Sequence, residues 1–254
     1  MHAAEAPLRP SQGPSPIRLS VVIPIHDEAP NIEALLAEID ASLGETDFEV
    51  ICVNDGSTDG TAAVLEAARR RFVWLRCLAH RERYGQSYAM RSGVGAARAP
   101  VVATLDGDGQ NDPADLPPLL TAFEALGAGA GPRLAIGWRR DRKDSALRKL
   151  AGRVANAVRG KLLGDPCPDS GCGLRVFERD AFLELPFFDH MHRFLPTLIV
   201  HAGGRIAVVP VKHRPRAGGR SKYGINDRLW VGIFDLLGVL WLKRRTRVTE
   251  VDEV

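Results

Sequence analysis

The stretch that decides the fold is Leu19-Ser-Val-Val-Ile-Pro-Ile25, an apolar and largely β-branched run that stops at His26-Asp27-Glu28. Such a run predicts a short strand that is buried on both faces. A helix is predicted next, over residues 31–43, because apolar residues recur there at helical spacing. The chain therefore opens with a buried strand, a polar strand end and an amphipathic helix.

The same order is repeated along the first half of the chain. Further strands are predicted at residues 48–54, 73–79 and 100–105, with helices at 61–71 and 85–98 between them. These connections are too long for hairpins, so the strands are expected to be parallel with right-handed crossovers. Ligands of such sheets bind outside the carboxyl ends of the strands, and polar clusters follow three of the predicted strands there.

The second half continues with less regular elements. Strands are predicted at residues 134–138, 174–177 and 206–211, and helices at 144–163, 190–202 and 226–242. An Ala/Gly stretch at residues 126–132 is expected to be a flexible connector, and residues 212–223 form a Gly/Arg loop without apolar periodicity.

Composition places the 254-residue chain among ordinary globular proteins, with 45% hydrophobic and 26% charged residues. The formal net charge of +3 is too small to indicate nucleic-acid binding, so no nucleic-acid partner is expected. Arginine is concentrated at residues 139–153, 205–228 and 243–247, which suits anionic small molecules or lipids. The four cysteines have no paired spacing that would indicate a zinc site, and nothing demands an oxidising compartment.

No signal peptide or membrane span is predicted. Residues 1–18 are rich in Pro, Ala and Ser and are expected to be a disordered lead. No apolar run approaches the roughly 20 residues that cross a bilayer. We therefore expect a cytoplasmic protein with its main domain at residues 19–223, a helix at 224–246 and a tail at 247–254.

The motif Asp106-Gly-Asp108-Gly-Gln110 carries the chemistry. Alternate residues of an extended segment point the same way, so Asp106, Asp108 and Gln110 are expected to present oxygen atoms to one point. Oxygen donors suit a hard cation, and a departing diphosphate needs such a cation because charge accumulates on it. The alternatives are a solvated acidic turn or a calcium loop, although the Glu that ends an EF-hand pattern is missing.

Asp55 lies at the end of the second predicted strand. A carboxylate there can accept a hydrogen bond from a nucleobase or a ribose, as acidic residues do in dinucleotide folds. The alternative is a structural turn in which one residue of Ser57 to Asp59 caps the next helix, and we expect both roles to be present. Pro24 to Glu28 would line the nucleoside from the first strand, or Glu28 is a first-turn helix charge.

Three segments, Val21-Val-Ile-Pro24 with Asp27-Glu28, Val53 to Thr61, and Asp106 to Pro113, together resemble the inverting GT-A family 2 glycosyltransferases. The later motifs are similar to the dolichol-phosphate mannosyltransferase branch of polyprenyl-phosphate glycosyltransferases; they are Gly137-Trp-Arg139, the helix at 148–153, Asp169-Ser-Gly171 and Arg216 to Gly224. The resemblance runs from Leu19 to Tyr223. It implies an α/β fold of the GT-A (Rossmann-like) type, with a mostly parallel sheet flanked by helices and an amphipathic helix at the C-terminal end.

The resemblance also implies an activity. It implies transfer of a sugar, such as mannose or glucose, from a GDP- or UDP-sugar to a polyprenyl (dolichyl or undecaprenyl) phosphate, with inversion at the anomeric carbon. It implies Mg²⁺ or Mn²⁺ at Asp106, Asp108 and Gln110, with Asp108 also counted as catalytic. His26 stands where Tyr is frequent and Arg83 where Asn is frequent, so GDP versus UDP stays open.

Other site residues follow from the same resemblance. The nucleoside is expected to contact Pro24, Glu28 and Asp55, and Asp106 is also expected at the donor. The phosphates of acceptor or donor are expected to lie among four basic residues, Arg139, Arg153, Arg216 and Lys222. A phosphate acceptor with a second pKa of about 6 is already anionic and needs no general base, so such a cage makes chemical sense. Asp169 is a secondary candidate near the acceptor, or it structures its own turn.

The apolar segment Leu229 to Leu242 is too short to span a bilayer. Trp230, Trp241 and Lys243-Arg244-Arg245 favour a helix in the headgroup region of a membrane surface, at its inner face. A buried packing helix and an oligomer interface are the alternatives.

Three rival functions remain. A related family 2 transferase would act on a sugar hydroxyl of a cell-envelope glycan, for which an acidic base is expected in the second half, where the chain is basic instead. A non-catalytic nucleotide-sugar-binding protein would not need the intact Asp106, Asp108 and Gln110 set. A nicotinamide oxidoreductase is disfavoured because no GxGxxG motif follows the first strand, although Tyr84-Gly85-Gln86-Ser87 opens a helix whose amino end can host a phosphate.

Overall fold

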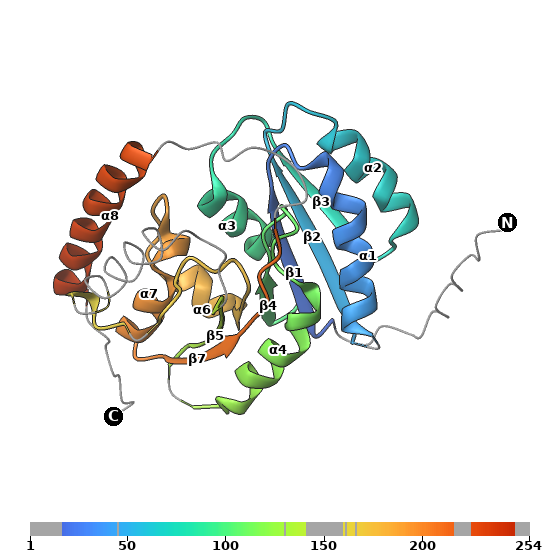
Figure 1. The fold of residues 1–254 in the computed structure, drawn as a ribbon. Helices are drawn as coiled ribbons and strands as arrows, with labels where there is room; N and C mark the ends of the chain where they lie inside the picture. The colour runs from blue at the N-terminus through green and yellow to red at the C-terminus, as the bar shows by residue number, and fades with distance from the viewer. Residues whose placement is uncertain are drawn as a thin grey trace, which may run out of the picture.

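The computed structural model describes residues 17–44, 46–129, 131–140, 160, 162–165, 167–215 and 225–246, and for residues 225–231 only the backbone. A seven-stranded sheet forms its centre (Figure 1). The strands are β1 (Leu19–Ile25), β2 (Phe48–Asp55), β3 (Leu75–His80), β4 (Val101–Thr104), β5 (Arg133–Trp138), β6 (Arg175–Glu178) and β7 (Arg205–Pro210). Their order across the sheet is β3-β2-β1-β4-β6-β5-β7.

The sheet is mostly parallel, as predicted. β1 pairs in parallel with β2 and β4, β2 with β3, and β5 with β7. Only β6 runs against its neighbours, pairing antiparallel with both β4 and β5. The amino-terminal end of β6 therefore lies at the same edge as the carboxyl ends of β1, β4 and β5.

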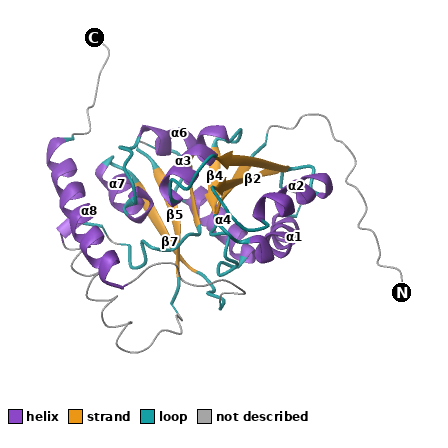
Figure 2. Cartoon of the chain, turned by 90° about the horizontal axis from the view of Figure 1, so that it is seen from above, coloured by secondary structure: helices purple, strands orange, loops and turns teal. Residues whose placement is uncertain are grey.

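Helices cover both faces of the sheet, and Figure 2 shows them above and below the strands. One layer holds α1 (Ile32–Leu43), α2 (Thr61–Arg71) and α4 (Leu116–Ala125), and the other holds α3 (Gln86–Ala96), α6 (Arg179–Glu184) and α7 (Leu195–His201). Short 3₁₀ turns are η1 (Ala29–Asn31), η2 (Pro113–Asp115) and η3 (Met191–Arg193). The last helix, α8 (Ile225–Arg245), stands at the edge of the molecule beyond α7.

Most predicted elements exist with slightly shifted ends. The strand expected at residues 73–79 begins at Leu75, and the helix expected at 190–202 is divided into η3 and α7. The Ala/Gly stretch before β5 is less free than a flexible connector, since Arg205 donates to the carbonyl oxygens of Leu126 and Gly127. The predicted lead at 1–18 and most of the helix at 144–163 lie outside the described residues.

Glu49 of β2 is an acidic side chain buried within the sheet, where it is 2% exposed. Its carboxylate accepts hydrogen bonds from Ser20 Oγ at 2.8 Å, from Arg76 Nη1 at 2.7 Å and from the Arg98 backbone at 2.7 Å. Burial alone raises the pKa of Glu49, but these hydrogen bonds and the charge of Arg76 outweigh burial and lower it. The ionised form is therefore what ties β1, β2, β3 and the end of α3 together.

Glu49→Gln is expected to lower the free energy of unfolding by about 2 kcal/mol at pH 7, because charge-assisted hydrogen bonds are lost. The folded-state pKa of Glu49 is depressed, so its contribution is fully present above the unfolded value near 4.5 and is lost as pH falls through the folded value. Urea unfolding at several pH values measures this. Glu66→Gln, at the exposed ion pair with Arg69, is the control and should change stability by less than about 1 kcal/mol; equal effects of the two substitutions would contradict the assignment.

Candidate active site

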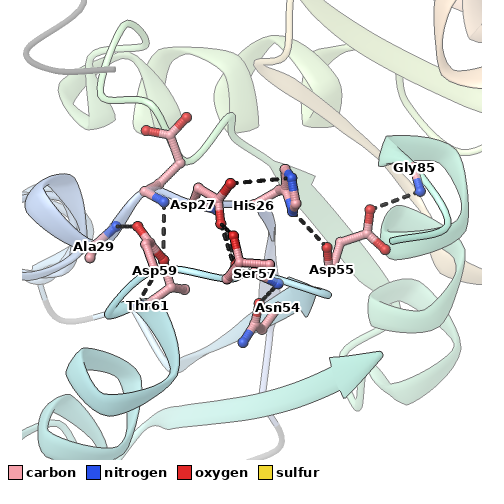
Figure 3. Close-up of polar contacts among 11 residues, drawn as sticks. His26, Asp27, Ala29, Asn54, Asp55, Ser57, Asp59, Thr61 and Gly85 are labelled. Atoms are coloured by element: carbon pink, nitrogen blue, oxygen red, sulfur yellow. Dashed lines mark hydrogen bonds and ion pairs between the residues drawn. The ribbon is translucent and has the colours of Figure 1, made fainter. Parts of the chain in front are cut away.

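Hydrogen bonds connect the loop after β1 to the loop after β2 (Figure 3). The Asp27 backbone N–H donates to Ser57 Oγ at 2.9 Å, and the Thr58 N–H donates to Asp27 Oδ1 at 2.7 Å. Asp59 accepts from the Thr61 N–H at the start of α2 and from the Ala29 N–H. The N-cap residue of α2 is Gly60, so the predicted cap within Ser57 to Asp59 is wrong by one position. These contacts hold the ends of two parallel strands at a fixed separation.

Asp55, at the end of β2, is 3% exposed and organises the start of α3. Its carboxylate accepts from His80 Nδ1 at 2.7 Å, the Tyr84 N–H at 2.9 Å and the Gly85 N–H at 2.8 Å. Burial opposes ionisation, but these donors prevail and lower the pKa of Asp55. Gly85 has a φ of 102°, a conformation that favours glycine. A contact from Asp55 to a nucleoside stays a prediction.

His26 links the same two strands. Its Nδ1 lies 2.8 Å from the Asp55 carbonyl oxygen, so Nδ1 carries the proton and donates. Its Nε2 lies 3.4 Å from Asp27 Oδ2. Pro24, within β1, is half-buried, and Glu28 accepts a hydrogen bond from Asn31 at 2.7 Å. Pro24, Glu28 and Asp55 thus lie at the ends of adjacent strands, as the sequence predicts.

Asp106 to Gln110 follow β4 as a turn, and the predicted extended conformation is wrong. Gly109 has a φ of 71°, and the Gln110 N–H donates to Asp108 Oδ1 at 3.1 Å, so the backbone curls around the Asp108 carboxylate. The charge of Asp108 raises the pKa of Asp106, so the two carboxylates interact electrostatically across this turn.

Asp106 is enclosed by residues from three elements. Gln86 Nε2, in the first turn of α3, donates to Asp106 Oδ1 at 2.8 Å. A Cβ on Gly173 would lie 2.2 Å from Asp106 Oδ2, so only glycine lets the chain before β6 approach this carboxylate. Burial raises the pKa of Asp106 most, followed by the charge of Asp108, whereas Arg175 and Arg139 oppose the increase.

Gln110 is oriented by the segment after β7. Its side-chain Nε2 lies 3.5 Å from both His213 Nε2 and the Arg214 backbone carbonyl oxygen. The backbone carbonyl oxygen of Gln110 accepts from the Arg214 N–H at 3.0 Å. A bridge between Asn111 and His213 extends the pairing. The amide nitrogen of Gln110 is thus turned toward residues 213 and 214.

Arg214 clamps this segment to the rest of the fold. Its Nη1 lies 2.6 Å from Glu38 Oε2 of α1, and its Nη2 lies 2.8 Å from Asp112 Oδ1. The hydrogen bond with Glu38, and then that with Asp112, raises the pKa of Arg214 against the effect of burial. The Lys212 N–H also donates to Asp115 Oδ2 at 2.8 Å. These contacts hold the chain after β7 against residues 112–115, which follow the turn at Asp106 to Gln110.

Arg139, which follows β5, makes a two-point ion pair with Asp169. Its Nε and Nη2 donate to Asp169 Oδ2 and Oδ1 at 2.7 and 2.8 Å, and its backbone N–H donates to Asp169 Oδ2 at 3.2 Å. Both side chains are nearly buried, with exposed fractions of 12% and 10%. Burial works against the charge, but the contacts with Asp169 raise the pKa of Arg139. The pairing of Asp169 with Arg139 is a structural role that differs from both roles expected from the sequence, a place near the acceptor and a part in its own turn.

Arg175, at the start of β6, was not predicted from the sequence. Its side chain is 1% exposed, and its Nη2 donates to the Ser170 carbonyl oxygen at 3.1 Å. Within the described residues, its Nε and Nη1 have no hydrogen-bond acceptor. Burial lowers the pKa of Arg175, and the negative charge of Asp106 opposes the decrease. Arg175 is therefore a second positively charged side chain, after Arg139, that interacts with Asp106. It occupies a buried strand position where an apolar residue is expected.

The structure brings Asp106, Asp108, Gln110 and Arg139 to one edge of the sheet. Arg153, Arg216 and Lys222 lie outside the described residues. The described residues contain no group of three or more His, Cys, Asp or Glu side chains that would hold a metal ion by themselves. Cys167 and Cys172 are buried, and burial raises the pKa of the Cys172 thiol to about 11. The site thus combines acidic oxygens on β4 with arginines from β5 and β6.

Residues 20–185 match the family model described as Glycosyl transferase family 2. The chain belongs to this family. Dodecaprenyl-phosphate galacturonate synthase of Rhizobium johnstonii is 34% identical over 251 residues, which cover 96% of this chain and 73% of that protein. Undecaprenyl-phosphate 4-deoxy-4-formamido-L-arabinose transferase of Edwardsiella ictaluri is 33% identical over 211 residues, 82% of this chain and 63% of that protein. The chain thus spans less than two thirds of the second relative.

Solved structures agree on the fold. Glucosyl-3-phosphoglycerate synthase of Mycobacterium tuberculosis, in complex with Mn²⁺, UDP-glucose and phosphoglyceric acid, superposes with a TM-score of 0.63 at 21% identity, covering 89% of this chain and 79% of that one. Mannosyl-3-phosphoglycerate synthase of Rubrobacter xylanophilus gives a TM-score of 0.65 at 18% identity, covering 93% and 77%. The GT-A fold predicted from the motifs is confirmed.

Asp169→Asn is expected to lower the free energy of unfolding by about 3 kcal/mol, because a nearly buried guanidinium loses its charged partner. Guanidinium chloride unfolding, followed by circular dichroism, measures the change. Asp180→Asn is the matched control, since Asp180 pairs with Arg179 at 2.7 Å but is 80% exposed; it should cost less than about 1 kcal/mol. An Asp169 variant as stable as the control would show that the pair does not support the fold.

Proposed function

We propose that this protein is an inverting glycosyltransferase that moves a hexose-type sugar from a nucleoside-diphosphate sugar to a polyprenyl phosphate. The observation that carries the proposal is the pair of carboxylates, Asp106 and Asp108, in the turn after β4, where the charges of Arg139 and Arg175 act on Asp106. Asp108 is buried and Asp106 is half-buried. Family membership supports the donor class. Relatives named for dodecaprenyl-phosphate and undecaprenyl-phosphate substrates support the acceptor class.

The donor set fits a divalent cation such as Mg²⁺ or Mn²⁺. Two carboxylates and an amide supply hard oxygen ligands, and the amide nitrogen of Gln110 is held by residues 213 and 214, which leaves its oxygen to face elsewhere. Among the described residues, no third carboxylate and no histidine forms a metal-holding group with Asp106 and Asp108. A cation held by so few protein ligands has coordination positions left for phosphate oxygens. Bound there, the cation stabilises the charge that develops on the departing diphosphate.

The residues around the pair support an acceptor that brings its own negative charge. A hydroxyl acceptor needs a general base, but the nearby Asp169 is committed to Arg139 at both of its oxygens. A phosphate monoester needs no base, since it is already anionic. Arg139, with Arg153, Arg216 and Lys222 from the motifs, would hold the two anionic groups together against their repulsion.

The proposal assigns residues 19–223 to the transferase unit and places the reaction at the inner face of a membrane. Asp106 and Asp108 hold the donor diphosphate side, and Pro24, Glu28 and Asp55 face the nucleoside. His26, in place of the frequent Tyr, donates to the end of β2, so it is positioned to influence the choice between GDP and UDP.

The test is incubation of the full chain with a detergent-solubilised polyprenyl phosphate and a panel of GDP- and UDP-sugars, with labelled glycolipid measured by chromatography. Glycolipid should form with one donor, disappear with a chelator and return with Mn²⁺. Asp108→Asn should reduce transfer by at least about 100-fold and weaken Mn²⁺ binding measured by electron paramagnetic resonance, whereas Asp180→Asn should change neither. Transfer that is insensitive to chelator would contradict the proposed metal dependence. Transfer to a free sugar but not to the lipid would contradict the proposed polyprenyl phosphate acceptor.

A second test concerns Arg214, whose backbone contacts Gln110 and whose side chain pairs with Glu38 and Asp112, neither of which is a proposed metal ligand. Arg214→Met should weaken Mn²⁺ binding by about tenfold, because residues that orient metal ligands contribute roughly 10–100-fold to affinity. Arg214→Lys should restore part of the loss, since it retains one of the two ion pairs. Arg69→Met, at an exposed pair on α2, is the control. Unchanged Mn²⁺ affinity in Arg214→Met would show that the clamp does not act on Gln110.

A further inference from the structure

Helix α8 carries a cluster of exposed apolar side chains. Eight large hydrophobic side chains are exposed in the described part of the chain, and four of them lie on this helix. They are Ile233, Phe234, Leu237 and Trp241, with exposed fractions of 39%, 70%, 56% and 61%. Leu237 follows Ile233 by four residues and Phe234 by three, and Trp241 follows Leu237 by four, so all four side chains lie on one side of the helix. We name this side, together with Arg244 and Arg245, the outer face.

The opposite side of α8 is fixed to the body of the protein. Val239 is 1% exposed, and Leu236, Leu240 and Leu242 pack against the core. Asp235 Oδ2 lies 3.2 Å from His190 Nδ1, and Lys243 Nζ donates to the Leu163 carbonyl oxygen. The rotation of the helix is therefore determined, and the outer face is directed away from the protein.

The charge of the outer face has one sign. Arg244 and Arg245 are exposed, and Arg244 follows Trp241 by three residues and Leu237 by seven, so it continues the apolar stripe. Between residues 232 and 246 the only acidic residue is Asp235, which lies on the docked side beside His190. An apolar stripe that ends in arginines fits a surface where acyl chains meet anionic headgroups.

We propose that the outer face of α8 rests on an anionic lipid bilayer. The inference rests in part on the proposed function, because a lipid-borne acceptor must be reached from a membrane surface. No helix among the described residues is long and apolar enough to cross a membrane, so α8 lies along the surface.

A second copy of the chain is a poorer occupant of this face. Parallel pairing of two outer faces would bring the arginines of both copies together, and like charges at an interface cost free energy. Antiparallel pairing would place Arg244 and Arg245 against Ile233 and Phe234 of the other copy, where none of the described side chains of α8 is a carboxylate that could receive them. A bilayer supplies both the apolar and the anionic component.

The docked side of α8 connects to the proposed active site through short contacts. His190 precedes η3, whose His192 has its Nδ1 2.7 Å from Ser87 Oγ at the start of α3. Gln86, which precedes Ser87 in α3, donates to Asp106. A helix resting on lipid would therefore hold the Asp106 turn at a constant height above the headgroups.

The experiment is co-sedimentation of the full chain with vesicles of pure phosphatidylcholine and with vesicles that contain phosphatidylglycerol. We expect binding to the anionic vesicles that is reduced by high salt. Arg244→Glu with Arg245→Glu should weaken it by roughly thirty-fold or more, since each basic residue near such a surface contributes about fivefold. Phe234→Ser with Trp241→Ser should weaken it by about tenfold or more. Val73→Ser, which removes a side chain that is 88% exposed elsewhere, should have no effect.

Far-UV circular dichroism and thermal unfolding establish that each variant is folded. Absence of binding by the unmodified chain, or equal binding by the outer-face variants, would overturn the proposal. It would also be overturned if these variants convert a dimer into a monomer in analytical ultracentrifugation without changing vesicle binding. Transfer to a short, water-soluble isoprenyl phosphate should be unchanged in both double variants. If the unmodified chain glycosylates no acceptor at all, the proposed function fails while vesicle binding is still scored by itself.

Discussion

The site depends on keeping two like charges close together inside a folded protein. Asp106 and Asp108 lie near enough for one to raise the pKa of the other, and burial of Asp106 adds to the cost of ionising it. Arg139 and Arg175 counter this from β5 and β6, the strands that complete the sheet beyond β4. Neutralisation by protonation would remove the oxygen ligands that a hard cation requires. The arginines therefore favour the ionised form of Asp106, which is the form that the proposed cation would need.

The arrangement of strands makes this compensation possible. In a purely parallel sheet only the carboxyl ends of strands meet at the ligand edge. Because β6 runs antiparallel between β4 and β5, its amino-terminal end lies at that edge as well. Gly173 and Arg175 are thereby placed against Asp106, and the turn at Asp169 meets Arg139. The antiparallel direction of β6 thus places Arg175 at the edge of the sheet where the acidic turn after β4 lies.

Much of the first half was predictable, because buried parallel strands are apolar throughout and polar residues mark where they end. The run before His26 and the motif at Asp106 are examples. α4 was not predicted, since its sequence begins Leu-Pro-Pro; both prolines lie in the first turn, where a helix tolerates the missing N–H. Arg175 and Arg214 were also missed as site residues. Arg175 reads as a surface charge, and Arg214 acts through Glu38 on α1, far away in sequence. No local pattern reports a contact between such distant segments.

The antiparallel placement of β6 also has a consequence for how the protein is made. Synthesis proceeds from the amino terminus, so β1 to β4 and the acidic turn leave the ribosome well before Arg139 and Arg175 do. A nascent chain that has completed the first four strands holds its carboxylates without their counter-charges. The contact of Gly173 with Asp106 forms only after β6 inserts beside β4. Any stall in translation between the two strands would leave an open sheet edge at β4, and such unpaired edges promote aggregation.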